Sequence, residues 1–176
     1  MATLQTFTAG QVLTAAQMNT LQSYIGVVQV QSTAKTDTFT MSSATFADVT
    51  GLSVTITPTS ASNKVLVSAV MMAGMDTGNT AWFARLLRDS TTIGVGDAAS
   101  NRKLVSVASF SGAVTTGQTA AVMFLDSPAT TSAVTYKIQI SAQTTAAVYI
   151  NRTHTDTDSS TFPRGISTIT AFEVTP

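Results

Sequence analysis

The side chains best suited to chemistry lie in one short run near the C-terminus, residues 151–158, which includes His154, the only histidine. If this run is extended, His154, Asp156 and Asp158 lie on one side, because side chains alternate along a strand. Carboxylates suit Ca²⁺ and an imidazole suits a transition metal, so a cation site is one interpretation. A solvated loop in which Arg152 pairs with an aspartate is simpler, and we favour it. We therefore predict no metal and no cofactor, and treat Arg152, His154, Asp156 and Asp158 as a candidate surface-binding loop.

Few residues of the chain are suited to catalysis. The absence of cysteine excludes disulfides, Cys-ligated zinc and thiol catalysis, and any Ser-His-Asp triad would need His154. A glycosidase needs two carboxylates facing one cleft, whereas most acidic residues here fall in predicted turns. We predict that the protein is not an enzyme. A hydrolase of surface polysaccharide is kept as an alternative, and it would use some of Asp76, Asp97, Asp126, Asp156 and Asp158.

Charge is scarce and balanced. Nine Lys and Arg oppose nine Asp and Glu, and charged residues make up 10% of the chain, against roughly 25% in ordinary soluble domains. Without a basic surplus we expect no nucleic-acid binding. The longest apolar run, residues 70–75, is far shorter than the ~20 residues that span a bilayer, so we expect no membrane insertion. The first residues lack the pattern of a secretion signal, so we expect assembly in the cytoplasm of a host cell.

The sequence predicts an all-β fold. Short segments rich in Val, Ile, Thr and aromatic residues alternate with turn-forming clusters. The clearest strand, 133–142, places five residues from Val134 to Ala142 on a dry face, and the C-terminal strand places Glu173 on a wet face opposite Phe172 and Val174. We expect an antiparallel β-sandwich with the topology of a jelly roll. Its strands are predicted near 27–33, 36–42, 44–50, 52–57, 64–73, 80–89, 103–111, 119–126, 133–142, 146–151 and 165–175.

The N-terminal segment differs from the rest, since no charged side chain precedes Lys35. Thr14 and Gln17 fit a capping box that would start a helix of about eleven residues, ending at Gly26. So short a helix must dock on its own domain, on sister subunits or on another protein. We therefore divide the chain into an N-terminal docking arm, 1–35, and a sandwich, 36–176. The residues expected to form the docking face are Leu13, Met18, Leu21 and Ile25.

Two predicted strands, around 65–72 and 120–125, are apolar on both faces. The outer face of a sandwich sheet normally meets water, so these strands need a second cover. Self-association is the interpretation we favour, and cover by the domain's own loops is the alternative. The neighbours Trp82 and Phe83 point to opposite faces of their strand, so we expect one in the core and the other facing a partner or the outer surface of the sheet.

Several runs resemble known sequences. Residues 7–19, which precede and open the predicted helix, resemble the start of many tailed-bacteriophage virion appendage proteins. Short tail-fibre, head-fibre-like and decoration proteins contain runs similar to residues 50–58, 84–89, 125–128 and 164–174. The resemblance implies a virion structural protein whose N-terminal segment docks on the particle and whose C-terminal β domain, often trimeric, projects outward.

These observations together predict a homotrimeric bacteriophage fibre or knob, located in the virion. Its partners would be other virion proteins of the capsid, neck or tail, and a host cell-surface glycan. The turn 76–79 and Arg102 are further candidates for contact with the host surface. The alternative within the structural class is a capsid cement protein that stabilises the shell.

Overall fold

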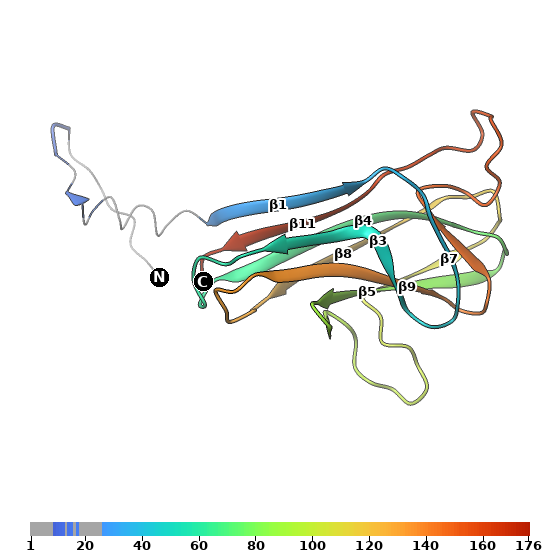
Figure 1. Cartoon of the computed structure of the whole chain (residues 1–176), viewed down its shortest axis with the longest axis horizontal. Coiled ribbons are helices and arrows are strands. Elements are labelled where there is room, and N and C mark those ends of the chain that lie inside the picture. Colours follow the sequence, from blue (N-terminus) through green and yellow to red (C-terminus); the bar gives the residue numbers. More distant parts are fainter. Residues whose placement is uncertain (1–8, 13, 16, 18–25) are drawn as a thin grey trace.

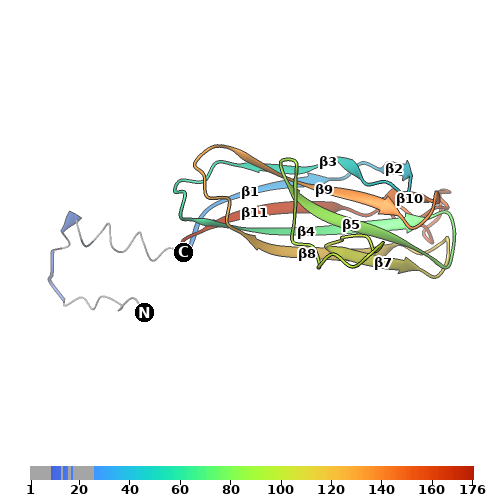
Figure 2. The ribbon, with the colours of Figure 1, turned by 90° about the horizontal axis from the view of Figure 1, so that it is seen from below.

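The computed structural model describes residues 9–12, 14, 15, 17 and 26–176, and within them eleven strands form two antiparallel sheets packed face to face (Figure 1, Figure 2). The predicted all-β antiparallel sandwich is thus confirmed. Sheet A consists of β1 (Val27–Lys35), β2 (Phe39–Ser42), β4 (Lys64–Met75), β8 (Gln118–Asp126), β10 (Ala147–Ile150) and β11 (Ser167–Val174). Sheet B consists of β3 (Ala47–Ile56), β5 (Thr80–Arg88), β6 (Thr91–Ile93), β7 (Val107–Ser111) and β9 (Val134–Ala142).

Several strands share a row of a sheet. Both β10 and β11 pair with the edge of β4 opposite β8, and β2 and β1 lie beyond them. Likewise β6 and β7 pair with one edge of β5, while β9 pairs with the other. The pairs β1 and β2, β6 and β7, and β10 and β11 each count as one row, which leaves eight rows numbered in chain order. These rows are arranged 1-8-3-6 in sheet A and 2-7-4-5 in sheet B. This is the strand order of a jelly roll.

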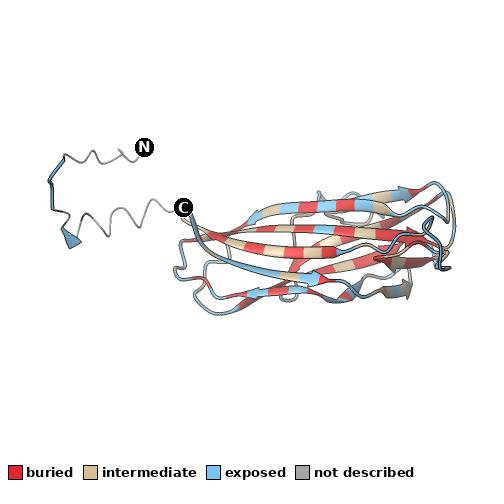
Figure 3. Cartoon of the chain, turned by 90° about the horizontal axis from the view of Figure 1, so that it is seen from above, coloured by how far each residue is buried: buried red, intermediate tan, exposed pale blue. Residues whose placement is uncertain are grey.

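The core lies between the sheets, and burial alternates along the strands as the pleat requires (Figure 3). On β9 the alternation is as predicted, since every second residue from Val134 to Ala142 is buried. Trp82 of β5 is fully buried while Phe83 is only partly buried, so that expectation is also confirmed. The inward residues of both sheets therefore form one apolar layer.

Two details of the strand prediction were wrong. The strand break expected at Gly51 is a bulge inside β3, because Gly51 has a φ of +81° and the pairing register shifts between Asp48 and Ser53. Glycine supplies this backbone conformation at little steric cost, so the strand continues through it. The short strand β6 was not predicted, and it pairs with the end of β5.

The predicted wet face of the C-terminal strand was also wrong. Glu173 is fully buried, whereas Phe172 and Val174 are directed outward and only partly buried. The carboxylate accepts hydrogen bonds from Asn63 Nδ2 (2.6 Å), Thr59 N (2.7 Å), Thr59 Oγ1 (2.8 Å) and Gln29 Nε2 (2.6 Å). Burial raises the pKa of Glu173, but these donors outweigh it and hold the pKa at about 2. Neutral donors from distant segments thus allow a charge inside the sandwich.

The N-terminal segment is described only in part. Gln17 N donates to Thr14 Oγ1 (3.3 Å) and Thr14 N donates to Gln17 Oε1 (2.9 Å), the reciprocal pair expected of a capping box. The expected docking residues Leu13, Met18, Leu21 and Ile25 lie outside the described residues. Strand β1 is an edge strand of sheet A, so "the arm" below means residues 1–26. In the described part of the chain, no helix is long and apolar enough to cross a membrane.

Candidate functional site

The candidate surface-binding loop connects two strands of the same row. Because β10 and β11 pair with one edge of β4, residues 151–166 leave the sheet and return to it at nearly the same point. Gly165 N donates to Asn151 O (2.9 Å), and Arg152 and Arg164 form an isolated antiparallel bridge. The loop is therefore closed at its base.

Asn151 fixes this base. It is fully buried with a φ of 64°, and asparagine tolerates that left-handed conformation better than most residues. Its Nδ2 donates to Lys35 O (2.7 Å) and Asp37 O (2.9 Å), while its Oδ1 accepts from Ser167 Oγ (2.6 Å). One side chain thus ties the loop to the end of β1 and the start of β11.

The loop also lies against β4. A Cβ added at Gly74 would lie 2.8 Å from both Arg152 O and Thr153 Cα. Any other residue at position 74 would therefore push the loop off the sheet.

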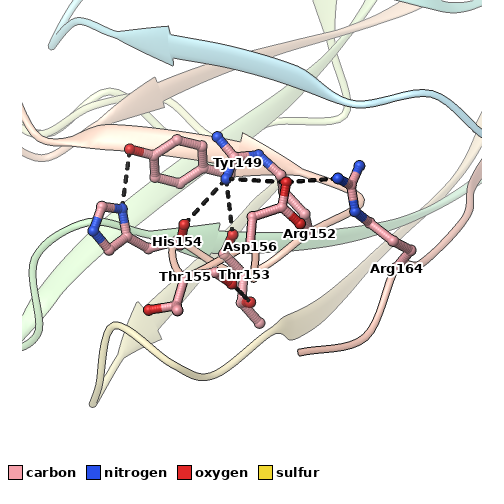
Figure 4. Close-up of polar contacts among 7 residues, drawn as sticks. All are labelled: Tyr149, Arg152, Thr153, His154, Thr155, Asp156 and Arg164. Carbon is pink, nitrogen blue, oxygen red and sulfur yellow. Dashed lines mark hydrogen bonds and ion pairs between the residues drawn. The ribbon is translucent and has the colours of Figure 1, made fainter. Parts of the chain in front are cut away.

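Asp156 is the centre of the polar cluster (Figure 4). Its Oδ2 lies 2.5 Å from Arg164 NH2 and 3.8 Å from Arg152 NH1. The Arg152 guanidinium stacks 4.0 Å from the centre of the Tyr149 ring. His154 Nδ1 lies 3.1 Å from Tyr149 Oη. The result is one continuous assembly of two cations, one carboxylate and two rings.

This geometry can be compared with the two sequence interpretations. Asp156 pairs with the guanidiniums, as the simpler interpretation predicted for Arg152, while His154 is turned toward Tyr149. The described residues contain no group of three His, Cys, Asp or Glu side chains placed to hold a metal ion. The loop is irregular rather than extended, so the alternation that would align His154, Asp156 and Asp158 does not apply.

A pocket of about 250 Å³ opens beside the cluster. One aromatic ring, one guanidinium, two carboxylates and two hydroxyls line it. Hydroxyls, carboxylates and an aromatic face are groups that hold a polyhydroxylated ligand by hydrogen bonds and ring contact. The lining residues are Asp156, Thr157, Asp158, Ser159, Phe162 and Arg164.

Of the acidic residues considered for a hydrolase, Asp156 and Asp158 share this pocket, whereas Asp126 and Asp76 lie in separate surroundings. Asp126 is buried and bonds to Arg88 NH1 (2.8 Å) and to Tyr136 Oη (2.7 Å). Burial, and then the Asp126 carboxylate, raise the pKa of Tyr136 well above its usual value. Asp76 accepts from Ala147 N (2.9 Å) and so joins its turn to β10. These two carboxylates stabilise the fold rather than face a common cleft.

The remaining candidates from the sequence differ in position. The turn 76–79 lies at the same end of the sandwich as the loop, because Asp76 contacts the start of β10. Arg102 and Asp97 lie in the connection between β6 and β7, away from this cluster, and both are exposed. Sequence reasoning missed Tyr149 and Phe162 as site residues, and it assigned no role to Arg164. No local sequence pattern singles out these three residues.

Comparisons with known proteins give a fold-level likeness. The sequence matches no protein-family profile and no curated protein. A chain in the structure of infectious bursal disease virus Gt strain is similar to 84% of this chain, at 12% identity and a TM-score of 0.45. A chain in the structure of the Gx strain is similar over the same share, at 11% identity and a TM-score of 0.40. This chain spans 38% of each of those chains, and we draw no functional conclusion from likenesses of this degree.

Proposed function

We propose that the protein is a virion structural protein, namely a trimeric bacteriophage appendage without enzymatic activity. The arm would dock on other virion proteins, and the sandwich would present the 151–166 loop to a host-surface glycan. Neither nucleic acid nor a membrane is a partner in this proposal. The sequence resemblance supports the phage assignment. Jelly rolls are used by viral capsid and lectin domains, which makes the fold compatible with it.

The observation that carries the proposal is that the point where the arm joins the sandwich, at Val27, and the 151–166 loop lie at opposite ends of β1. Strand β1 begins beside the end of β11, where Val27 pairs with Val174, and it ends beside Ser167, next to the loop (Figure 1). The nine residues of β1 span about 30 Å at roughly 3.3 Å per residue. A segment that joins β1 at Val27 and docks on the particle would hold the sandwich so that the loop projects away from the particle.

Deleting the arm tests the docking role. We expect a chain that starts at Val27 to unfold at nearly the same temperature as the full chain, because all core residues in the described part of the chain lie within residues 27–174. It should fail to enter particles assembled in the absence of the full chain. A truncated chain that still enters particles would overturn the anchoring role.

Changing the cluster tests the adhesive role. Asp156→Asn removes the charge that holds Arg164 and Arg152 together, so binding of assembled particles to host cells should fall several-fold. Asp97→Asn makes the same chemical change in the exposed β6–β7 connection and should leave binding unchanged. Equal adsorption by both variants would exclude the loop as the host-binding surface.

A capsid cement protein is the second candidate, and it is favoured by apolar side chains such as Met123 and Leu125 that β8 of sheet A exposes and that shell proteins would cover. Particles without the protein would then lose resistance to heat or pressure while still adsorbing to host cells. Loss of adsorption with unchanged particle stability would favour the appendage.

A further inference from the structure

The outer face of sheet A carries a row of apolar side chains across all four strand rows. The pairing register aligns Val30 with Phe172, Phe172 with Leu66, and Leu66 with Leu125. Their neighbours along each strand, such as Val65 and Val67, are buried. Because successive side chains of a strand point to opposite faces, the residues of this row point outward. Met123 and Val70 extend the row along β8 and β4. These six residues define "the outer face" below.

Nothing in the described part of the chain covers this face. Met123 is 71% exposed, Val30 and Leu125 are each 48% exposed, and Val70 is 39% exposed. Contiguous apolar surface of this kind marks an interaction site in soluble proteins. The strand β8 also ends the sheet, so its backbone edge is free of a further strand within the described residues.

We infer that the outer face of sheet A binds further copies of this chain. Lys64 is the only charged side chain that the described strands of sheet A direct outward. A partner surface must then be almost uncharged too, because burying an unpaired charge is costly. The other broad face of the molecule, that of sheet B, carries Arg85, Lys137 and Asp48 and does not meet this requirement. The same face on another copy does.

The size of the face fits such an interface. Four strand rows about 4.8 Å apart and the nine residues of β8 at about 3.3 Å each give roughly 19 Å by 30 Å, or on the order of 600 Å². Two copies then bury about 1,200 Å² in total, the lower bound for a stable interface between proteins. A single helix of about eleven residues is roughly 17 Å long and 10 Å wide, so the predicted arm helix covers less than half of it.

The test is the oligomeric state of the full chain, measured by light scattering and sedimentation at micromolar concentrations. We expect an oligomer for the unchanged chain. Leu125→Lys and Val30→Lys place an ammonium at either end of the apolar row, and each should weaken association by about 100-fold or more. Phe110→Lys is the matched control, because Phe110 is 58% exposed but lies on β7 of sheet B. It should leave association unchanged.

The expectation of a trimer rests on the proposed function. The possible outcomes distinguish a failure of this inference from a failure of that function. A trimer that survives both lysine variants overturns the inference and leaves the trimeric appendage in place. A dimer that the variants dissociate supports the interface and contradicts the trimer. A full chain that stays monomeric overturns both the inferred interface and the trimeric appendage. If deleting the arm from such a chain produces an oligomer, the arm is the segment that covers the outer face. Circular dichroism should confirm that each variant is folded.

Discussion

The outer faces of the two sheets are built differently, although each covers one side of the same core. On sheet B, the connection between β6 and β7 brings Lys103 across the sheet. Its Nζ donates to Ala44 O (2.6 Å), Ala142 O (2.8 Å) and Ser141 Oγ (3.1 Å) and lies 5.0 Å from the centre of the Phe83 ring. Burial lowers the pKa of Lys103. The chain thus covers part of this face itself.

Charged side chains cover a further part of the outer face of sheet B. The Arg85 guanidinium lies 4.2 Å from the centre of the Phe46 ring and donates to Gln139 Oε1, while Gln139 and Lys137 both donate to Asp48. The outer face of sheet A offers apolar side chains and hydroxyls instead. The contrast shows that the chain itself covers part of the outer face of sheet B, whereas no described residue covers the outer face of sheet A, as the inferred interface requires. Sheet A is held to the rest of the protomer from its inner side.

If sheet A is held to the protomer from its inner side, replacing Glu173 should cause the largest loss of protomer stability. Glu173→Ala removes the acceptor of four hydrogen bonds from Asn63, Thr59 and Gln29 at a fully buried position, which we expect to lower the free energy of unfolding by about 3 kcal/mol. Phe172→Ala, on the outer side of the same strand, should cost less because Phe172 is only partly buried. Urea unfolding measures both. A larger loss for Phe172→Ala would contradict the contrast between the two sides of sheet A.

The pH dependence of the unfolding free energy should report the titration of the Glu173 carboxylate. The pKa of Glu173 is about 2 in the folded protein, below its ordinary 4.5, so the carboxylate stabilises the fold fully above pH 4.5. That contribution is lost as the pH falls from 4.5 toward 2. The difference in unfolding free energy between the unchanged chain and Glu173→Gln should therefore shrink over this range. A constant difference would show that Glu173 does not titrate in this way.

Removing Lys103 should have a moderate effect on sheet B. Lys103→Met leaves two backbone carbonyls without their donor, and we expect a loss of about 1–2 kcal/mol in urea unfolding. Amides of the β6–β7 connection should exchange faster with solvent. Lys137→Met removes a more exposed ion pair and should cost less than about 1 kcal/mol. Equal losses would mean that Lys103 does not hold the connection in place.

The fold was more predictable from the sequence than the site, for a physical reason. The alternation of Val134, Tyr136 and Ile138 is a local pattern, and it predicted the buried side of β9. The inward direction of Glu173 depends on donors from Gln29, Thr59 and Asn63, which are far away in the sequence, so no local pattern could reveal it.

The polar cluster shows the same limit. Arg152, His154 and Asp156 were predicted as site residues, but Tyr149, Arg164 and the contacts among the five residues were not. The left-handed backbone at Asn151 ends β10, and residues 152–164 then follow a closed loop instead of a strand. As a result Asp156 meets Arg164, eight residues away, rather than His154 and Asp158 in a common ligand set.

Oxidation of methionine by hydrogen peroxide tests the central claim, that copies of the chain cover the outer face of sheet A, most directly. Met123 is 71% exposed in the single chain, whereas Met71 and Met75 are fully buried and serve as internal references. We predict that Met123 of the intact protein oxidises nearly as slowly as these two, and several-fold faster in the Leu125→Lys variant. Rapid oxidation of Met123 at the same rate in both proteins would contradict the account.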